Sequence, residues 1–219
     1  LLMKIVFVLF DSLNRNAMEP YGSNVVRTPN FNRFGERAVT FDNHYVGSLP
    51  CMPARRDLHT GRNHFLHRSW GPLEPFDDSF PELLKQNGFY SHLITDHHHY
   101  FADGGATYHQ RFSSWELVRG QAIDRWKAEV KPDFDKLRSG YHPVQHHRTN
   151  YMINRKYMRN EEDYCAPQLF KMANDFLCEN HGEDGWLLQL ECFDPHEPFH
   201  APSRFRELYP TNYNGPILD

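Results

Sequence analysis

The segment from Cys51 to Gly61, CMPARRDLHTG in one-letter code, combines residue types that could attack and hold an anion. Pro53 suits the first turn of a helix, so Cys51 is expected near a helix N-terminus, where unpaired N–H groups and the helix dipole favour negative charge. Arg55 would lie one turn further along the same face, and its guanidinium suits a pair of sulfate or phosphate oxygens. The segment therefore predicts a nucleophile and a cation beside an oxyanion.

A thiol phosphatase is a second interpretation of this segment. Such a site would place more residues between the cysteine and the arginine, in a loop rich in backbone donors. Here three residues separate Cys51 from Arg55 and four separate it from Arg56, while Pro53 removes one backbone donor. We therefore rank this interpretation below the first.

Further candidate site residues follow three apolar runs. These runs, residues 4–10, 91–95 and 185–193, predict buried parallel strands. The polar residues that come directly after them include Asp11, Asp96, His98 and His196. Ligands of open α/β sheets bind at the carboxyl ends of the strands, so these positions support a site independently of the cysteine segment.

The order of strands and helices predicts the fold class. Helices are expected at residues 29–38, 51–60, 80–87 and 161–180, and a further strand at 39–46. Residues 100–160 are less regular, with helical pieces expected around Trp115 and Trp126, and read as an insertion that shapes a pocket or forms a peripheral cap. The alternation indicates an α/β fold with a mostly parallel central sheet and helices on both faces.

The cysteine segment fills every fixed position of the pattern C-x-P-x-R-x-x-x-x-T-G. It resembles the signature of the formylglycine-dependent sulfatases, which belong to the alkaline-phosphatase superfamily. The resemblance implies that Cys51 is oxidised by a separate formylglycine-generating enzyme, that the hydrated aldehyde is the nucleophile and also contacts the metal, and that Arg55 is catalytic.

The resemblance extends to Asp11, which would be a ligand of a divalent cation. Many sulfatases carry two consecutive aspartates at this point, whereas this chain has Asp11-Ser12. The departure resembles the phosphonate-monoester-hydrolase branch of the family. Calcium is the ion that the resemblance favours, and manganese or a similar ion is the alternative.

Two later segments complete the resemblance. Residues 88–98 resemble the family pattern G-Y-x-T-x-x-x-G-K-W-H, in which His98 would contact the ester group or the nucleophile, and Asp96 stands where sulfatases keep a substrate-binding lysine. Residues 193–199 resemble D-P-H-x-P-F, in which His196 would bind the scissile group or protonate the leaving oxygen. His97 and His99 are expected to lie in a solvated loop.

The function expected from the resemblance is metal-dependent hydrolysis of a small-molecule sulfate ester. Hydrolysis of a phosphonate monoester or phosphodiester is the first alternative, supported by Ser12 and Asp96. Family members run to roughly twice this length, so residues 1–219 are interpreted as the N-terminal part of a catalytic domain whose other metal ligands lie elsewhere. The second alternative is an inactive portion that only binds an anion or a partner. A second copy of the chain is one such partner.

Composition narrows the remaining choices. The formal net charge of −4 gives no pull toward nucleic acid or a membrane surface, and no apolar run is long enough to span a bilayer. No signal peptide is evident, so a cytoplasmic location is expected, or a periplasmic or secreted one if a leader was removed. Cys165, Cys178 and Cys192 form no C-x-x-C pair and are expected to be buried, inert thiols without a disulfide framework.

Overall fold

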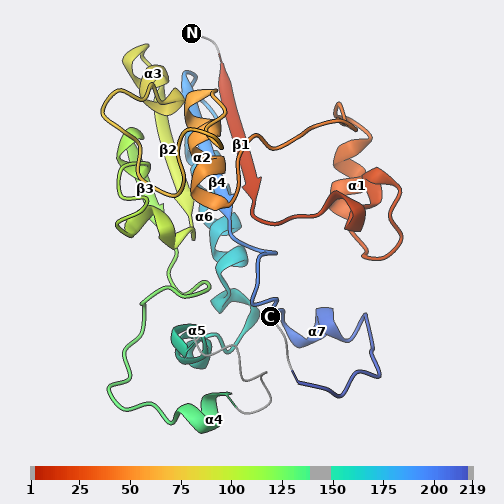
Figure 1. Ribbon diagram of the computed structural model, residues 1–219. Coiled ribbons are helices and arrows are strands. Elements are labelled where there is room, and N and C mark those ends of the chain that lie inside the picture. Colours follow the sequence, from red (N-terminus) through yellow and green to blue (C-terminus); the bar gives the residue numbers. More distant parts are fainter. Residues whose placement is uncertain (1–2, 139–148, 217–219) are drawn as a thin grey trace.

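Four parallel strands form the centre of the molecule, in the spatial order β1–β4–β2–β3 (Figure 1). The computed structural model describes residues 3–138 and 149–216. The strands are β1 (Lys4–Phe10), β2 (Tyr90–Thr95), β3 (Ser114–Leu117) and β4 (Trp186–Cys192). The strands predicted at residues 4–10, 91–95 and 185–193 are confirmed to within one residue at each end, and so is the parallel sheet.

Helices pack against both faces of this sheet, as the sequence predicted. The α-helices are α1 (Pro29–Gly35), α2 (Cys51–Thr60), α3 (Phe80–Gln86), α4 (Phe134–Arg138), α5 (Thr149–Asn154), α6 (Cys165–Asn180) and α7 (Ser203–Arg206). Short 3-10 helices are η1 (Arg15–Ala17), η2 (Glu19–Tyr21), η3 (His98–Phe101), η4 (His109–Arg111), η6 (Arg155–Tyr157) and η7 (Glu161–Asp163). None of the helices in the described ranges has the length and apolar character that crossing a bilayer requires.

Strand β4 shows why the sheet needs cover on both sides. All of its residues are buried, and successive side chains point to opposite faces. Leu188 and Leu190 join the core that α6 covers with Leu169, whereas Leu187 joins a second core with Met52 of α2. Figure 1 shows α4, α5 and α7 beyond the carboxyl ends of the strands, where the candidate residues also lie.

The anchoring of α2 fixes where its first residue, Cys51, stands. Arg56 is 1% exposed, and its Nη2 lies 2.6 Å from Oδ2 of Asp77 in the loop before α3. The same carboxylate oxygen accepts the backbone N–H of Glu74 at 2.8 Å. Gly61 ends the helix with a φ of +67°, a conformation that glycine adopts without strain. The ion pair thus anchors the middle of the helix, and Gly61 defines its C-terminal end.

Three predictions about elements are wrong. Residues 39–46 form no strand: Val39, Phe41 and Tyr45 are 81%, 66% and 83% exposed, so their alternation does not reflect a buried face. Trp115 lies in strand β3 rather than in a helical piece, because β3 obtains its hydrogen bonds from β2, a partner that local periodicity does not reveal. Trp126 lies in neither a helix nor a strand.

Three further expectations are corrected in part. The helix predicted at 29–38 ends at Gly35, and the one at 161–180 begins as the 3-10 turn η7 before α6. Cys165 and Cys192 are buried as predicted, but Cys178 is exposed because it lies on the solvent side of α6. The boundaries proposed for the insertion at 100–160 stay a prediction, although its residues 114–117 belong to the sheet.

A buried histidine makes the fold sensitive to acid. His59 of α2 packs against the rings of Phe80, Tyr108 and Phe112, and its Nδ1 lies 2.8 Å from the Ser79 hydroxyl. Burial lowers its pKa from 6.5 to about 3. The folded chain keeps His59 neutral while the unfolded chain protonates it, so its contribution is complete above the unfolded pKa and declines as the pH falls below it.

We therefore expect His59→Gln to flatten the pH dependence of stability. Between pH 7.5 and 5.5 the wild-type chain should lose about 1 kcal/mol more unfolding free energy than this variant. Urea unfolding at both pH values measures the difference. His44→Gln, which changes an exposed histidine, should behave like the wild type; equal slopes for the wild type and His59→Gln would contradict the prediction.

Candidate active site

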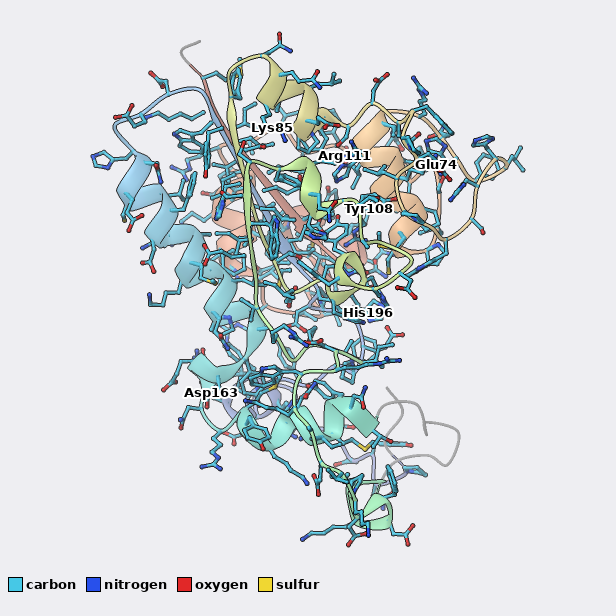
Figure 2. The ribbon with its side chains drawn as sticks, turned by 90° about the vertical axis from the view of Figure 1, so that its left-hand side faces the viewer. Glu74, Lys85, Tyr108, Arg111, Asp163 and His196 are labelled. Carbon is cyan, nitrogen blue, oxygen red and sulfur yellow. The ribbon has the colours of Figure 1, made fainter. Side chains whose placement is uncertain are left out.

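Three residues from three separate elements converge at the carboxyl edge of the sheet. One ligand atom each of Asp11, Cys51 and His196 lies within 4.8 Å of the others. Asp11 follows β1, and its N–H donates to Cys192 O at 2.9 Å, which extends the β1–β4 ladder by one residue. Cys51 begins α2, and His196 lies in the turn after β4. We call this group the strand-end cluster; in Figure 2, His196 lies where the sheet gives way to the helices beyond it.

Arg55 is held between two carboxylates beside the strand-end cluster. Its Nη1 lies 2.8 Å from Asp11 Oδ2, and its Nε lies 3.4 Å from Glu191 Oε2. Burial disfavours its charge, but Glu191 first and also Asp11 outweigh that effect and raise its pKa, so the guanidinium stays protonated. The sequence correctly placed Arg55 beside Cys51, one helical turn along α2.

Glu191 is a site residue that the sequence did not reveal. Its carboxylate is 1% exposed, and Oε1 accepts the Tyr100 hydroxyl at 2.6 Å and the Gln189 amide at 2.7 Å. Its one signal was an acidic residue inside an otherwise buried strand, where a charge needs a partner. The two carboxylates of Glu191 and Asp11 and the one guanidinium of Arg55 together carry a formal net charge of one negative unit, which favours binding of a cation.

The Cys51 thiol is protonated at neutral pH. Burial and then the Asp11 carboxylate raise its pKa from 9.0 to about 11, against the opposing effect of Arg55. The helix N-terminus thus does not make this cysteine a thiolate, in contrast to what its position indicated. A thiol nucleophile of the phosphatase type is disfavoured on this ground.

The turn after β4 orients His196. Nδ1 lies 2.9 Å from the Glu197 carbonyl oxygen, which can only accept, so Nδ1 carries the proton in that contact. The other ring nitrogen is then left with its lone pair for a ligand or a proton. The imidazole also packs on Phe193, with ring centroids 4.4 Å apart.

Asp96 lies beneath this turn rather than on a cavity wall. It is 1% exposed, and its Oδ1 accepts the N–H of Phe193 at 2.7 Å. Burial, and then the nearby Asp194, raise its pKa well above the usual range, which favours the neutral acid. Its carboxyl group therefore fixes the backbone that carries His196, while its predicted contact with substrate stays a prediction.

The three consecutive histidines have different surroundings. His97 is fully buried against Tyr100 and Phe193, so its expected place in a solvated loop is wrong. His99 is partly buried and packs edge-on against Trp70. His98 does not join the strand-end cluster; its ring packs against Phe193 with centroids 5.6 Å apart, and burial lowers its pKa to about 4.

Two cavities are lined by candidate histidines. One, of about 610 Å³, has His196 in its wall together with residues of α6 and α7. The other, of about 570 Å³, is lined by His98, Arg119 and Asp124, and the Arg119 guanidinium already forms two contacts with Asp124, at 2.8 and 2.9 Å. Both cavities have the size of small-molecule sites.

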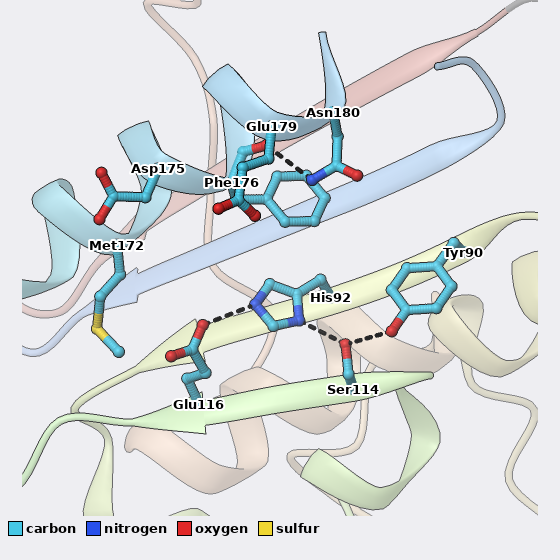
Figure 3. A pocket seen from close by; sticks show the side chains of 9 residues that line it. All are labelled: Tyr90, His92, Ser114, Glu116, Met172, Asp175, Phe176, Glu179 and Asn180. Atoms are coloured by element: carbon cyan, nitrogen blue, oxygen red, sulfur yellow. Dashed lines mark hydrogen bonds and ion pairs between the residues drawn. The ribbon is translucent and has the colours of Figure 1, made fainter. Parts of the chain in front are cut away.

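A third cavity, of about 400 Å³, lies between β2, β3 and α6 (Figure 3). Its Ser114 hydroxyl lies 2.6 Å from His92 Nδ1 and accepts the Tyr90 hydroxyl at 2.9 Å, while His92 Nε2 lies 3.3 Å from Glu116. Although these are the residue types of a hydrolytic triad, His92 and Ser114 are direct partners in adjacent strands. The contacts therefore tie β3 to β2 and are separate from the strand-end cluster.

The strand-end cluster fits a divalent cation. Asp11 offers an oxygen, His196 a nitrogen and Cys51 a sulfur, which oxidation to formylglycine would replace by oxygen. The Asp11 oxygen suits calcium as well as manganese, so the choice of calcium over manganese stays a prediction.

Comparison with known proteins identifies the family. The sulfatase family model matches residues 4–215, and the chain belongs to that family. Its curated relatives include the N-acetylglucosamine-6-O-sulfatase of Bacteroides thetaiotaomicron, 29% identical over 53% of the chain and 20% of the relative. The ulvan-active sulfatase of Formosa agariphila is 26% identical over 94% of the chain and 38% of the relative. The choline-sulfatase of Rhizobium meliloti is 21% identical over 94% of the chain and 40% of the relative. The chain thus spans less than half the length of these relatives.

Solved structures show the same fold. The structure of BT4656 in complex with its substrate D-glucosamine-2-N,6-O-disulfate superposes with a TM-score of 0.62 at 21% identity, over 91% of this chain and 36% of that one. The structure of Ps i-CgsB in complex with k-i-k-neocarrahexaose superposes with a TM-score of 0.63 at 19% identity, over 96% of this chain and 49% of that one. The α/β fold predicted from the sequence is therefore the sulfatase fold.

We expect Glu191→Ala to destabilise the chain by about 3 kcal/mol, because it leaves Arg55 with one carboxylate in a buried site. Urea unfolding measures the change, and Glu191→Gln, which keeps an acceptor for Tyr100, should lose less. Asp175→Ala is the control, since it breaks an exposed ion pair with Lys171 and should leave the unfolding midpoint unchanged. Equal midpoints for Glu191→Ala and the control would refute the role given to Glu191.

Proposed function

We propose that this chain takes part in the hydrolysis of sulfate esters through a formylglycine formed from Cys51 and with the help of a divalent cation. The observation that carries the proposal is the strand-end cluster, which brings Asp11, Cys51 and His196 within 4.8 Å in a chain of the sulfatase family. Arg55 adds a buried positive charge to the same place.

Each residue has a role in this proposal. Oxidised Cys51 would supply a hydrated aldehyde whose oxygen attacks sulfur while the bond from sulfur to the alcohol oxygen breaks; the resulting hemiacetal would then expel sulfate and regenerate the aldehyde. Asp11 and Cys51 would hold a divalent cation, which would supply stabilisation of negative charge on the sulfate oxygens. The Arg55 guanidinium adds a fixed positive charge to the same task. His196 would protonate the leaving oxygen from its imidazolium form, in which Nδ1–H donates to the Glu197 carbonyl and Nε2 carries the proton that is transferred; His98 is the second candidate for that step.

Hydrolysis of a phosphonate monoester or phosphodiester remains the second candidate. The Ser12 hydroxyl donates to Asp11 Oδ1 at 2.9 Å, so a hydroxyl stands where many sulfatases have a second carboxylate. Asp96 stands where sulfatases keep a lysine, and its carboxyl group provides no positive charge to bind a sulfate. The names of the relatives, which refer to sugars, ulvan and choline, do not select one alcohol for this chain. A maturation enzyme acting on Cys51 and a cytoplasmic location are part of the proposal.

Mass spectrometry of the Cys51 peptide, from chain co-expressed with a formylglycine-generating enzyme, tests the nucleophile. We expect loss of one sulfur and two hydrogens and gain of one oxygen. An unmodified thiol under these conditions would contradict the proposal. In the longest natural form of the protein, Cys51→Ala should abolish hydrolysis, whereas Cys178→Ala, which changes an exposed cysteine, should not. Parallel assays of an aryl sulfate and an aryl phosphodiester separate the two candidate reactions.

Metal binding tests the ligand set without turnover. We expect Asp11→Asn to weaken binding of Mn²⁺, measured by calorimetry, by roughly tenfold or more. Asp103→Asn changes an exposed aspartate outside the strand-end cluster and should bind like the wild type. If both variants kept the wild-type affinity, Asp11 would not be a ligand. Circular dichroism should show that both variants are folded.

A further inference from the structure

The cavity of about 610 Å³ shares one wall with the strand-end cluster. His196 belongs to both, so a molecule in the cavity lies next to the residue proposed to protonate the leaving oxygen. We call this space the α6–α7 cavity. The alcohol portion of a substrate must leave from beside His196, and this space is large enough to hold it.

Apolar side chains form most of the wall of the α6–α7 cavity. Phe170 and Pro167 come from α6, Phe199 from the loop after His196, and Phe205 from α7. Three phenyl rings line one space, but the Arg204 guanidinium lies over the Phe205 ring and Phe170 stacks on Phe10. Phe199, the most exposed of the three, is therefore the ring most open to a stacked or edge-to-face contact with a guest ring. A guest that is itself flat and apolar gains most from such a wall.

The polar groups of the α6–α7 cavity are already engaged. Both carboxylate oxygens of Glu161 contact Arg204. His200 lies between two tyrosine hydroxyls, 2.9 Å from that of Tyr151 and 3.3 Å from that of Tyr164. The Gln121 amide donates to Asp194 at 2.6 Å. Among the described lining residues there is no lysine or arginine. Arg204 contacts the wall but is already paired with Glu161, so a second sulfate or carboxylate on the guest would have to compete with Glu161 for this charge.

Phe199 is held in a strained conformation at this wall. Its φ of +49° lies in the left-handed region, which is costly for an aromatic residue, and its ring is 65% exposed. The strain is not offset by burial of the ring in a core. Strained residues of this kind concentrate at ligand-binding positions, and a bound ring would cover the exposed phenyl group.

We propose that the α6–α7 cavity is the subsite for the alcohol portion of the sulfate ester and that it selects an uncharged aryl alcohol. The proposal rests on the proposed function, since it places the leaving group beside His196. It adds the chemical class of the substrate: a monosulfate ester whose alcohol is aromatic and carries no second anionic group.

Binding of 2-naphthol to the chain with unprocessed Cys51, followed by calorimetry, tests the subsite. We expect saturable binding of 2-naphthol. The compound 6-hydroxynaphthalene-2-sulfonate has the same ring system with an added anion and should bind roughly tenfold more weakly. Methyl glucoside should bind more weakly than 2-naphthol. Equal or tighter binding of the sulfonate or of the glucoside would overturn the proposal, as would no binding of 2-naphthol.

Two matched variants locate the binding. Phe199→Ala removes an exposed ring of the cavity wall and should weaken 2-naphthol binding by roughly fivefold to tenfold. Phe76→Ala removes a ring that is 69% exposed in the loop before α3, outside the cavity, and should change nothing. Equal binding by both variants would place the naphthol elsewhere and overturn the proposal.

The binding assay needs no turnover, so its result is independent of the proposed function. Failure of 2-naphthol to bind would remove the aryl subsite and leave hydrolysis of sulfate esters in place. Absence of formylglycine at Cys51 would remove the proposed nucleophile and leave the measured binding in place.

Discussion

The buried guanidinium of Arg55 is the constraint on which the site depends. A charge that is 6% exposed costs several kcal/mol unless it is paired, and its partners Asp11 and Glu191 come from the ends of the adjacent parallel strands β1 and β4. Helix α2 can satisfy Arg55 only when it lies across this edge of the sheet. Because Cys51 is one helical turn away, the same docking brings its side chain to Asp11.

A second buried ion pair fixes the rotation of α2 about its own axis. Consecutive residues of a helix point about 100° apart, so Arg56 faces a different neighbour from Arg55, the loop that contains Asp77. One arginine thus holds the helix to the sheet and the next holds it to the loop before α3. The position of Cys51 follows from these two pairs, since no side-chain cap fixes the start of the helix.

The sequence predicted those parts of the fold for which a local residue pattern corresponds to one structural element. Apolar runs marked β1, β2 and β4, and parallel strands share an edge, so Asp11, Asp96, His98 and His196 were expected there. Of these, Asp11 and His196 join the strand-end cluster, whereas Asp96 and His98 do not. Glu191 could not be predicted, because its partner Arg55 is 136 residues away. Strand β3 depends on hydrogen bonds from β2, and the apolar residues of 39–46 are exposed; in both cases tertiary contacts, not local periodicity, decide the outcome.

Phe193 links Asp96 to two of the candidate histidines. Asp96 accepts the Phe193 N–H, and the buried Phe193 ring packs against both His98 and His196. In the proposed function Asp96 supplies no positive charge, so the charge that a sulfate needs would come from Arg55 and from a cation at the strand-end cluster. Charge would then be concentrated at the edge of the sheet, and the α6–α7 cavity, which His196 lines, would bind the alcohol by apolar contact.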